Sequence, residues 1–237
     1  MDWRHGLRRR DEPPLIPHPS SLQLPRLYTY VVRYDNGVAP NPFWGTCTLA
    51  VCKPAIRRTA QIGDWILGTG SKQSHLAPGE THDLSGAAVY AMQVTGKMPL
   101  AAYDQHCRQH LPEKIPDLSS LDWRCRVGDC LYDFGGDIHT PALRPGYHED
   151  GERSRDLGGV NVLLSDCFAY FGAAAPDLPA SLQHLVHAGQ GHRGWSDAEK
   201  VAAFEKWFAG LERNRLYGEP QLTWEVMATV ANLTESK

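Results

Sequence analysis

Long apolar runs and a strong charge of one sign are both missing from this sequence of 237 residues. It contains no stretch of about eighteen apolar residues, and the start Met1-Asp2-Trp3-Arg4-His5 has no apolar segment typical of a secretory signal. We therefore expect no membrane association and a cytoplasmic location. The formal net charge of −3 provides no general attraction to phosphate, which disfavours tight, non-specific binding of duplex DNA.

Diagnostic site motifs are also scarce. Gly68-Thr69-Gly70 lacks both the third glycine of a dinucleotide fingerprint and the Gly-Lys-Ser/Thr of a P-loop. The 6 cysteines are spread along the chain, which indicates reduced thiols rather than a disulfide framework. The pairs Cys47/Cys52 and Cys125/Cys130 lie in segments that read as strands, and their spacing is wider than that of a zinc knuckle. We predict no metal and no cofactor.

The apolar residues that are present, 42% of the chain, suffice for a sizeable core. Periodicity and turn residues predict strands over 27–34, 46–52, 64–68, 86–95 and 160–165, and helical segments over 54–60, 99–109, 178–187 and 196–212. Ser196-Asp197-Ala198-Glu199 has the pattern of a capping box at the start of the last helix. The fold is therefore expected to be α+β with a helical C-terminal tail.

Three regions are expected along the chain. Residues 1–25 form a Pro- and Arg-rich arm that we predict to be disordered, residues 26–212 form one domain, and residues 213–237 form a C-terminal extension. Within the domain, residues 117–155 are rich in Gly, Pro, Asp, His and Arg and show little periodicity. Such long loops usually carry function or are mobile.

Aromatic residues in a proline-stiffened loop are the first candidates for ligand binding. Residues 39–45 cannot form a helix or a central strand, because proline fixes φ and removes a backbone donor. Phe43 and Trp44 are predicted to offer stacking faces to a base, with Asn41 beside them and Trp65 nearby. Ordinary core packing is the alternative for most of these aromatics.

Basic and glycine-rich segments are the second group of candidates. Lys53 and Arg57 are expected to meet phosphate, with solvated surface charge as the alternative. Gly68, Gly70 and Ser71 follow a predicted strand, where successive backbone N–H groups are able to bind an anion. A tight connection that needs positive φ is the alternative for the glycines.

An enzymatic function is kept as the alternative to simple binding. The loop Gly189-Gln190-Gly191-His192-Arg193 and the region 117–155 are more polar than a passive binding module needs. Asp64, Asp129 and His192 are the candidates for acid and base. Asp64 follows Gly63 at a strand entry, so a role in the turn competes with a catalytic one.

Several segments together resemble the nucleotide modification-associated domain 2 proteins of bacteria and phages. The likeness covers about residues 26–212 and is carried by these segments: 27–37, 39–45, 52–57, 63–71, 89–95, Tyr103, Gly128-Asp129, Asp156-Leu157, 161–165, 170–172 and 189–193. It implies a role beside systems that hypermodify nucleic-acid bases, and assigns no reaction. The implied partners are a nucleotide, a modified base or a nucleic acid, with base-modification enzymes as candidate partners.

One piece departs from the family pattern. Gly128-Asp129-Cys130-Leu131-Tyr132 stands where such domains commonly carry a Gly-Asp-Asn-Ile-Tyr-like segment. The order of elements is also similar to PUA-like domains of the ASCH and EVE groups, which implies a small mixed β-barrel or strongly bent sheet that holds a base in an aromatic cleft. The two functional hypotheses are a nucleotide- or modified-base-binding protein and a transferase or hydrolase that acts on a nucleotide base.

Overall fold

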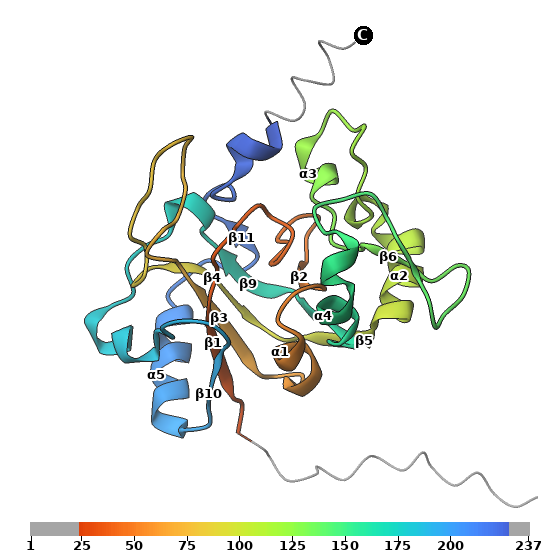
Figure 1. Cartoon of the computed structure of the whole chain (residues 1–237). Coiled ribbons are helices and arrows are strands. Elements are labelled where there is room, and N and C mark those ends of the chain that lie inside the picture. The colour runs from red at the N-terminus through yellow and green to blue at the C-terminus, as the bar shows by residue number, and fades with distance from the viewer. Residues whose placement is uncertain (1–23, 228–237) are drawn as a thin grey trace, which may run out of the picture.

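The computed structural model describes residues 24–227, so nearly all of the expected N-terminal arm lies outside the described residues. The main sheet has six strands in the order β10 (Arg193–Trp195), β1 (Leu27–Val31), β3 (Trp65–Thr69), β4 (Ala88–Gln93), β9 (Cys167–Tyr170) and β11 (Arg215–Leu216) (Figure 1). Strands β1 and β3 are parallel, as are β9 and β11, and the other neighbours are antiparallel.

A second, antiparallel sheet has the order β2 (Cys47–Leu49), β8 (Asn161–Ser165) and β5 (Gly96–Pro99), and β6 (Tyr132–Asp133) pairs with β7 (Ala142–Leu143) as a hairpin. The strands within residues 24–227 do not close into a barrel, because β10 and β11 form the two edges of the main sheet and do not pair with each other. The mixed α+β class is therefore confirmed, whereas the expected barrel is not.

The core has several layers because both faces of the main sheet are apolar. Along β9, Cys167 and Ala169 face a cluster with α5 (Ala198–Phe208) and the 3-10 helix η4 (Ala180–Leu185). Phe168 and Tyr170 point to the opposite face, where β2, β8 and α1 (Pro54–Thr59) pack. This alternation is the two-residue period of a strand. The far side of the smaller sheet packs on α2 (Leu100–His110).

The helical segment expected over 178–187 is the 3-10 helix η4 (Ala180–Leu185). Two local expectations need correction. Helix α5 is capped by Asp197, whose side chain accepts from the N–H groups of Glu199 and Lys200, so Ser196 is not its cap. Cys125 lies in the short helix α3 (Trp123–Arg126), not in a strand.

The long polar region contains only short elements. Besides α3 and the β6–β7 hairpin, it holds the 3-10 helix η2 (Asp150–Glu152) and α4 (Arg153–Leu157); η1 (Pro112–Lys114) precedes it and η3 (Gly172–Ala174) follows β9. All six cysteines are free thiols. No helix in the described part of the chain is long and apolar enough to cross a membrane.

Residues 213–227 pack on the domain rather than extending away from it. Strand β11 pairs with β9, and Leu222 and Val226 are buried. The Leu222 N–H donates to the carbonyl of Asp35, in the loop after β1. The C-terminal segment up to residue 227 is therefore tied to the same core as the first strand.

Candidate functional site

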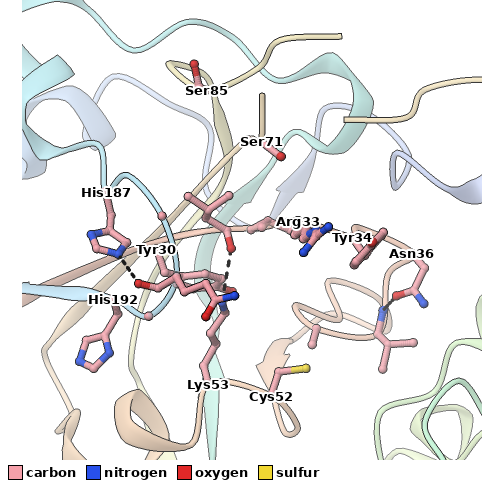
Figure 2. A pocket seen from close by; sticks show the side chains of 18 of the residues that line it. Tyr30, Arg33, Tyr34, Asn36, Cys52, Lys53, Ser71, Ser85, His187 and His192 are labelled. Carbon is pink, nitrogen blue, oxygen red and sulfur yellow. Dashed lines mark hydrogen bonds between the residues drawn. The ribbon is translucent and has the colours of Figure 1, made fainter. Parts of the chain in front are cut away.

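A cavity of about 1360 Å³ opens where the parallel strands β1 and β3 end. Residues 32–34 and 70–72, which directly follow these strands, form part of its wall (Figure 2). The segments 52–55 and 183–192 supply further walls. Ligands commonly bind at the carboxyl ends of parallel strands, where the loops that leave the sheet diverge. The topology thus creates a cleft larger than the roughly 300–1,000 Å³ of typical small-molecule sites.

Cations outnumber carboxylates in the cavity wall. Its charged residues are Arg33, Lys53, Lys72, Arg155, Glu152 and Glu225. An ion pair of 2.8 Å joins Arg155 and Glu152, so the remaining positive charges include Lys53 and Lys72. The wall therefore favours an anionic ligand.

Lys53 stands at the start of α1 with its side chain held in the wall. Its Nζ donates to the carbonyl of Val31 over 3.3 Å and lies 4.3 Å from the centre of the Tyr30 ring. Burial lowers the pKa of Lys53, opposed by the neighbouring Cys52 and reinforced by Arg155. An anion entering the cavity would replace part of the solvation that this ammonium group has lost.

Two histidines come from the glycine-rich loop after η4, and Figure 2 shows His187 and His192 on the same wall. Gly189 and Gly191 adopt φ of 93° and 89°, a left-handed conformation that favours glycine. The His192 ring lies 5.9 Å from that of Tyr28. Burial, together with His187 and Lys53, lowers the pKa of His192, which keeps its imidazole neutral at pH 7.

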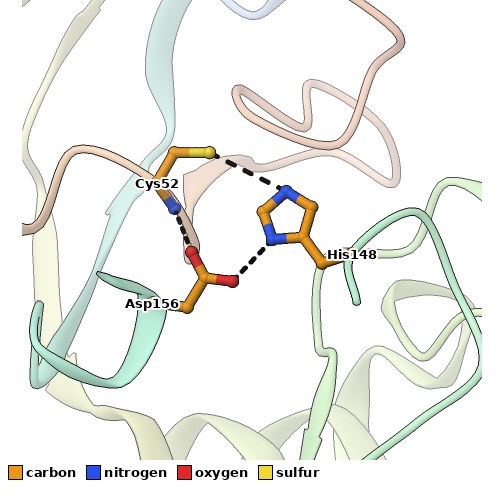
Figure 3. Close-up of side chains that lie close together, drawn as sticks. All are labelled: Cys52, His148 and Asp156. Atoms are coloured by element: carbon orange, nitrogen blue, oxygen red, sulfur yellow. Dashed lines mark hydrogen bonds and ion pairs between the residues drawn. The ribbon is translucent and has the colours of Figure 1, made fainter. Parts of the chain in front are cut away.

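Cys52, His148 and Asp156 meet at the edge of this cavity, and Figure 3 shows the imidazole lying between the other two side chains. Cys52 Sγ lies 3.8 Å from His148 Nε2, and His148 Nδ1 lies 2.5 Å from Asp156 Oδ2. The other oxygen of Asp156 accepts from the backbone N–H of Cys52 over 2.9 Å. One carboxylate therefore fixes both the imidazole and the backbone of the cysteine.

In this triad, His148 and Asp156 stabilise each other's charged forms. Burial lowers the pKa of His148, but its hydrogen bonds to Asp156 and Cys52 outweigh burial and raise the pKa to about 10. Burial alone would raise the pKa of Asp156, yet the contacts with His148 hold it below its usual value. At neutral pH the geometry thus favours an imidazolium between a carboxylate and the sulfur.

Cys52 has an unusual backbone conformation. Its φ is 56°, and the following Lys53 has a φ of 37°, both in the left-handed region that side chains with a Cβ rarely adopt. Such strain is commonly found at functional sites, where the surrounding structure imposes it. Here the bond from the Cys52 N–H to Asp156 helps to hold the conformation.

The same three residues are also of metal-binding type, since their ligand atoms lie within 4.8 Å of one another. A metal takes one nitrogen of an imidazole. In this cluster Asp156 faces Nδ1 whereas Cys52 faces Nε2, so the two potential ligands approach opposite sides of the ring. This arrangement fits a hydrogen-bonded triad better than a shared metal.

Four of the residues proposed from the sequence line the cavity: Lys53, Gly70, Ser71 and His192. The two glycines of the expected anion-binding turn have another role. Neither Gly68 nor Gly70 has positive φ, and an added Cβ would lie 2.4 Å from Tyr90 or Leu84, respectively. The Gly70 N–H donates to Ala87 and that of Ser71 to Ser74, so neither is available for an anion.

Arg57 is fully buried and faces away from the cavity. Its guanidinium donates to the carbonyls of Cys52 and Asn161 at 2.8 and 3.1 Å, and also to those of Ala50 and Asp156. It therefore joins the loop before α1 to the segment that carries Asp156. The structure gives Arg57 a supporting position behind the triad rather than a contact with phosphate.

The loop 39–45 also packs inward. Asn41 is buried, with its side chain bonded to Val127 and Lys114. Phe43 packs edge-on against Trp123, with ring centres 5.3 Å apart, and Arg124 lies 4.8 Å from the Trp44 ring. None of the loop's predicted ligand residues lines the cavity.

Trp65 lies on the other face of the main sheet. Its ring packs against Phe208 of α5 at 4.7 Å, and its Nε1 donates to Glu205 over 2.8 Å. It does not line the cavity. The fold therefore separates Trp65 from Phe43 and Trp44, which pack in one common cluster.

The two candidate aspartates lie outside the cavity. Asp64 accepts from the N–H groups of Arg26 and Gln61, each over 2.8 Å, as a turn residue does. Asp129 is buried and accepts from Thr48 and Tyr103 at 2.5 and 2.7 Å. Burial raises the pKa of Asp129, opposed first by the charge of Lys114.

Sequence reasoning missed the triad because its members are far apart in the chain. Cys52 and His148 are separated by 96 positions, and no short motif joins them. A signal was present in the polar region 117–155, which contains His148, and in Cys52-Lys53-Pro54 at a helix start.

Comparison with known proteins gives one match. No curated protein and no solved structure matches the chain, so the similarity to PUA-like domains is not supported by a solved fold. The model of the family described as nucleotide modification associated domain 2 matches residues 24–228, which include the cavity and the C-terminal segment. The chain belongs to the nucleotide modification associated domain 2 family.

Proposed function

We propose that this protein binds a nucleotide or a modified base in the cavity at the ends of β1 and β3. The observation that carries the proposal is a cleft with excess positive charge and imidazole groups in a chain of a nucleotide modification-associated family. A phosphate is the anion that such a family most directly suggests. Lys53 and Lys72 are the residues assigned to it, because both line the cavity.

The base requires a flat, partly apolar surface. Tyr34 is 60% exposed at the cavity wall, and Arg33 lies 5.3 Å from the centre of its ring. His192 offers a second planar group on the loop after η4. Stacking between such groups is a general way to hold a base without a fixed sequence. Phe43 and Trp44 have no part in this arrangement.

The test is a thermal-shift and mass-spectrometric comparison of nucleosides, nucleoside monophosphates and short oligonucleotides, canonical and modified. A ligand that binds the native state raises the apparent Tm. Lys53→Gln should weaken the binding of a nucleoside monophosphate by roughly tenfold, since a hydrogen bond to a charged group contributes about 1.5–3 kcal/mol. The same change should leave the affinity for the corresponding nucleoside nearly unchanged.

Lys206→Gln is the matched control, because Lys206 is exposed on α5 and does not line the cavity. It should bind like the wild type. An absence of binding throughout the panel, or equal loss in both variants, would contradict the proposal. The alternative of an enzyme that uses Asp64 and Asp129 as acid and base is not favoured, since both lie outside the cavity.

A further inference from the structure

We propose that Cys52 is a catalytic nucleophile, that His148 moves its proton, and that Asp156 positions His148, for attack on an amide or ester carbonyl of a nucleotide-linked acyl group. The identity of the substrate rests on the proposed function, because it assumes a nucleotide in the cavity. The reactivity of the thiol depends on the side chains around it and not on the identity of the ligand. The two parts are therefore separable by experiment.

Position distinguishes Cys52 from the other cysteines. Cys47, Cys107, Cys130 and Cys167 are buried, whereas Cys52 is half-buried and lines the cavity. It alone among the six faces an imidazole that is in turn fixed by a carboxylate. A nucleophile, a base within reach and a third group that orients the base are the signature of covalent catalysis, and the first contact is often longer before substrate binds.

Positive charge surrounds the sulfur. Lys53 and Arg155 line the same cavity, and each interacts electrostatically with Cys52. Arg57 lies fully buried behind it and also interacts electrostatically with Cys52. The attacking species in thiol chemistry is the thiolate, and the His148 imidazole beside the sulfur is the group within reach of its proton.

The carboxylate also explains why the imidazole is held in one orientation. Asp156 is fully buried and is bonded both to His148 Nδ1 and to the Cys52 N–H. With Nδ1 bonded to Asp156, Nε2 is directed at the sulfur (Figure 3). Asp156 therefore acts through His148 and is a positioning residue.

The reaction follows from these positions. The thiolate attacks the carbonyl carbon, a C–S bond forms, and the C=O π electrons move to oxygen. Collapse of this adduct breaks the bond to the amine or alcohol, which takes its proton from His148 Nε2, and leaves an acyl thioester on Cys52. Water, deprotonated by His148, then attacks the thioester and releases a carboxylic acid and the thiolate. The net change is hydrolysis of an amide or ester, with no oxidant or reductant.

The first experiment measures the alkylation of each cysteine by iodoacetamide between pH 5 and 9 (a range set by the ordinary thiol pKa of about 8.5). Peptide mass spectrometry reports the rate at each position in the EDTA-treated full chain. Cys125, which is half-buried and whose pKa is raised by burial, is the internal control. At pH 6 Cys52 should react at least about tenfold faster than Cys125.

Variants of the triad distinguish activation of the Cys52 thiol by His148 from a reactivity that is due only to the exposure of Cys52. His148→Gln should slow Cys52 about tenfold at pH 6 and restore an ordinary thiol pH profile, with Cys125 unchanged. Asp156→Asn should shift the profile in the same direction, and circular dichroism checks that each variant is folded. A Cys52 rate equal to that of Cys125, or one unaffected by His148→Gln, would overturn the proposal. Stoichiometric zinc that protects Cys52 before EDTA treatment would overturn it in favour of a metal site.

The second experiment uses two acyl donors, N4-acetylcytidine 5′-monophosphate and p-nitrophenyl acetate. The proposal expects a hydroxylamine-sensitive acetyl group on Cys52 from both, absent in Cys52→Ser, with faster transfer from the nucleotide. If p-nitrophenyl acetate alone acetylates Cys52 and no nucleotide binds, the role of Cys52 as a nucleophile is supported and the proposed nucleotide-binding function is rejected. If a nucleotide binds but Cys52 is unreactive, the role of Cys52 as a nucleophile is rejected and the nucleotide-binding function is supported.

Discussion

At the scale of single residues, burial separates supporting groups from groups that a ligand is able to reach. Lys53 and Arg57 are four positions apart in the chain, yet Lys53 lines the cavity whereas Arg57 is enclosed by backbone carbonyls. A sequence window shows two cations on one short segment and cannot show which way each points. Lys53, Gly70, Ser71 and His192 line the cavity, and their roles in binding or catalysis stay predictions. The triad partners of Cys52 required the fold.

The pH dependence of stability tests the contacts of His148. Its pKa is raised from 6.5 to about 10 in the folded state, so the unfolded chain binds fewer protons between these values. The stabilisation from the charged imidazole is fully present below pH 6.5 and is lost as the pH rises through 10. The free energy of unfolding of the wild type should therefore exceed that of His148→Gln most at about pH 6 and approach it above about pH 10.

Urea denaturation at a series of pH values gives this difference. Exposed His139 provides the control, and His139→Gln should follow the wild type at every pH. A wild-type advantage over His148→Gln that stays constant from pH 6 to 10 would show that the imidazole does not carry the expected charge.

At the scale of elements, the strands were the most predictable part of the fold. The apolar and aromatic runs at 27–34 and 86–95 contain β1 and β4, and the run at 64–68 contains β3 except for Thr69, because these strands are buried on both faces. The type of helix was harder to predict from the sequence, because Pro179 and the apolar spacing at 178–187 suit an α-helix and a 3-10 helix alike. The N-terminus of α5 was misplaced by one residue because Ser196 and Asp197 are both good caps.

The cap of α5 provides a test at this scale. Asp197 accepts from the N–H groups of Glu199 and Lys200 at 3.0 and 3.1 Å. Asp197→Ala should lower the free energy of unfolding by about 1 kcal/mol, because two backbone donors lose their acceptor. Ser196→Ala is the neighbouring control and should have little effect. If chemical denaturation shows the same loss of unfolding free energy in both variants, Asp197 is not the cap.

At the scale of the whole molecule, the arrangement of sheets was beyond the sequence pattern. Alternation shows which residues of a strand share a face but does not identify the partner strand, so one barrel and two packed sheets were both compatible with it. The parallel pairing of β1 and β3 depends on contacts across the fold, and it brings residues 32–34 and 70–72 to one cavity. The family resemblance supplied the setting that the separate motifs could not.

The C-terminal segment tests the extent of the folded unit. Val226 is fully buried in a cluster with Val38 and Phe43, although it lies beyond residue 212. Val226→Asp should lower the free energy of unfolding by more than about 2 kcal/mol, because it buries an unpaired carboxylate. Met227 is 52% exposed, so Met227→Asp should be nearly neutral in the same denaturation experiment. Two equally stable variants would mean that residues after 212 do not contribute to the core.

Protection of Cys52 from alkylation by a bound nucleotide tests directly whether the nucleotide occupies the cavity that the triad borders. Iodoacetamide labelling is followed at Cys52 and Cys125 while a nucleoside monophosphate is titrated into the purified full chain. Because Cys52 lines the proposed binding cavity and Cys125 does not, the nucleotide should slow labelling of Cys52 in a saturable way and leave Cys125 unchanged. Unchanged labelling of Cys52 at nucleotide concentrations that saturate binding would place the nucleotide elsewhere and contradict the account.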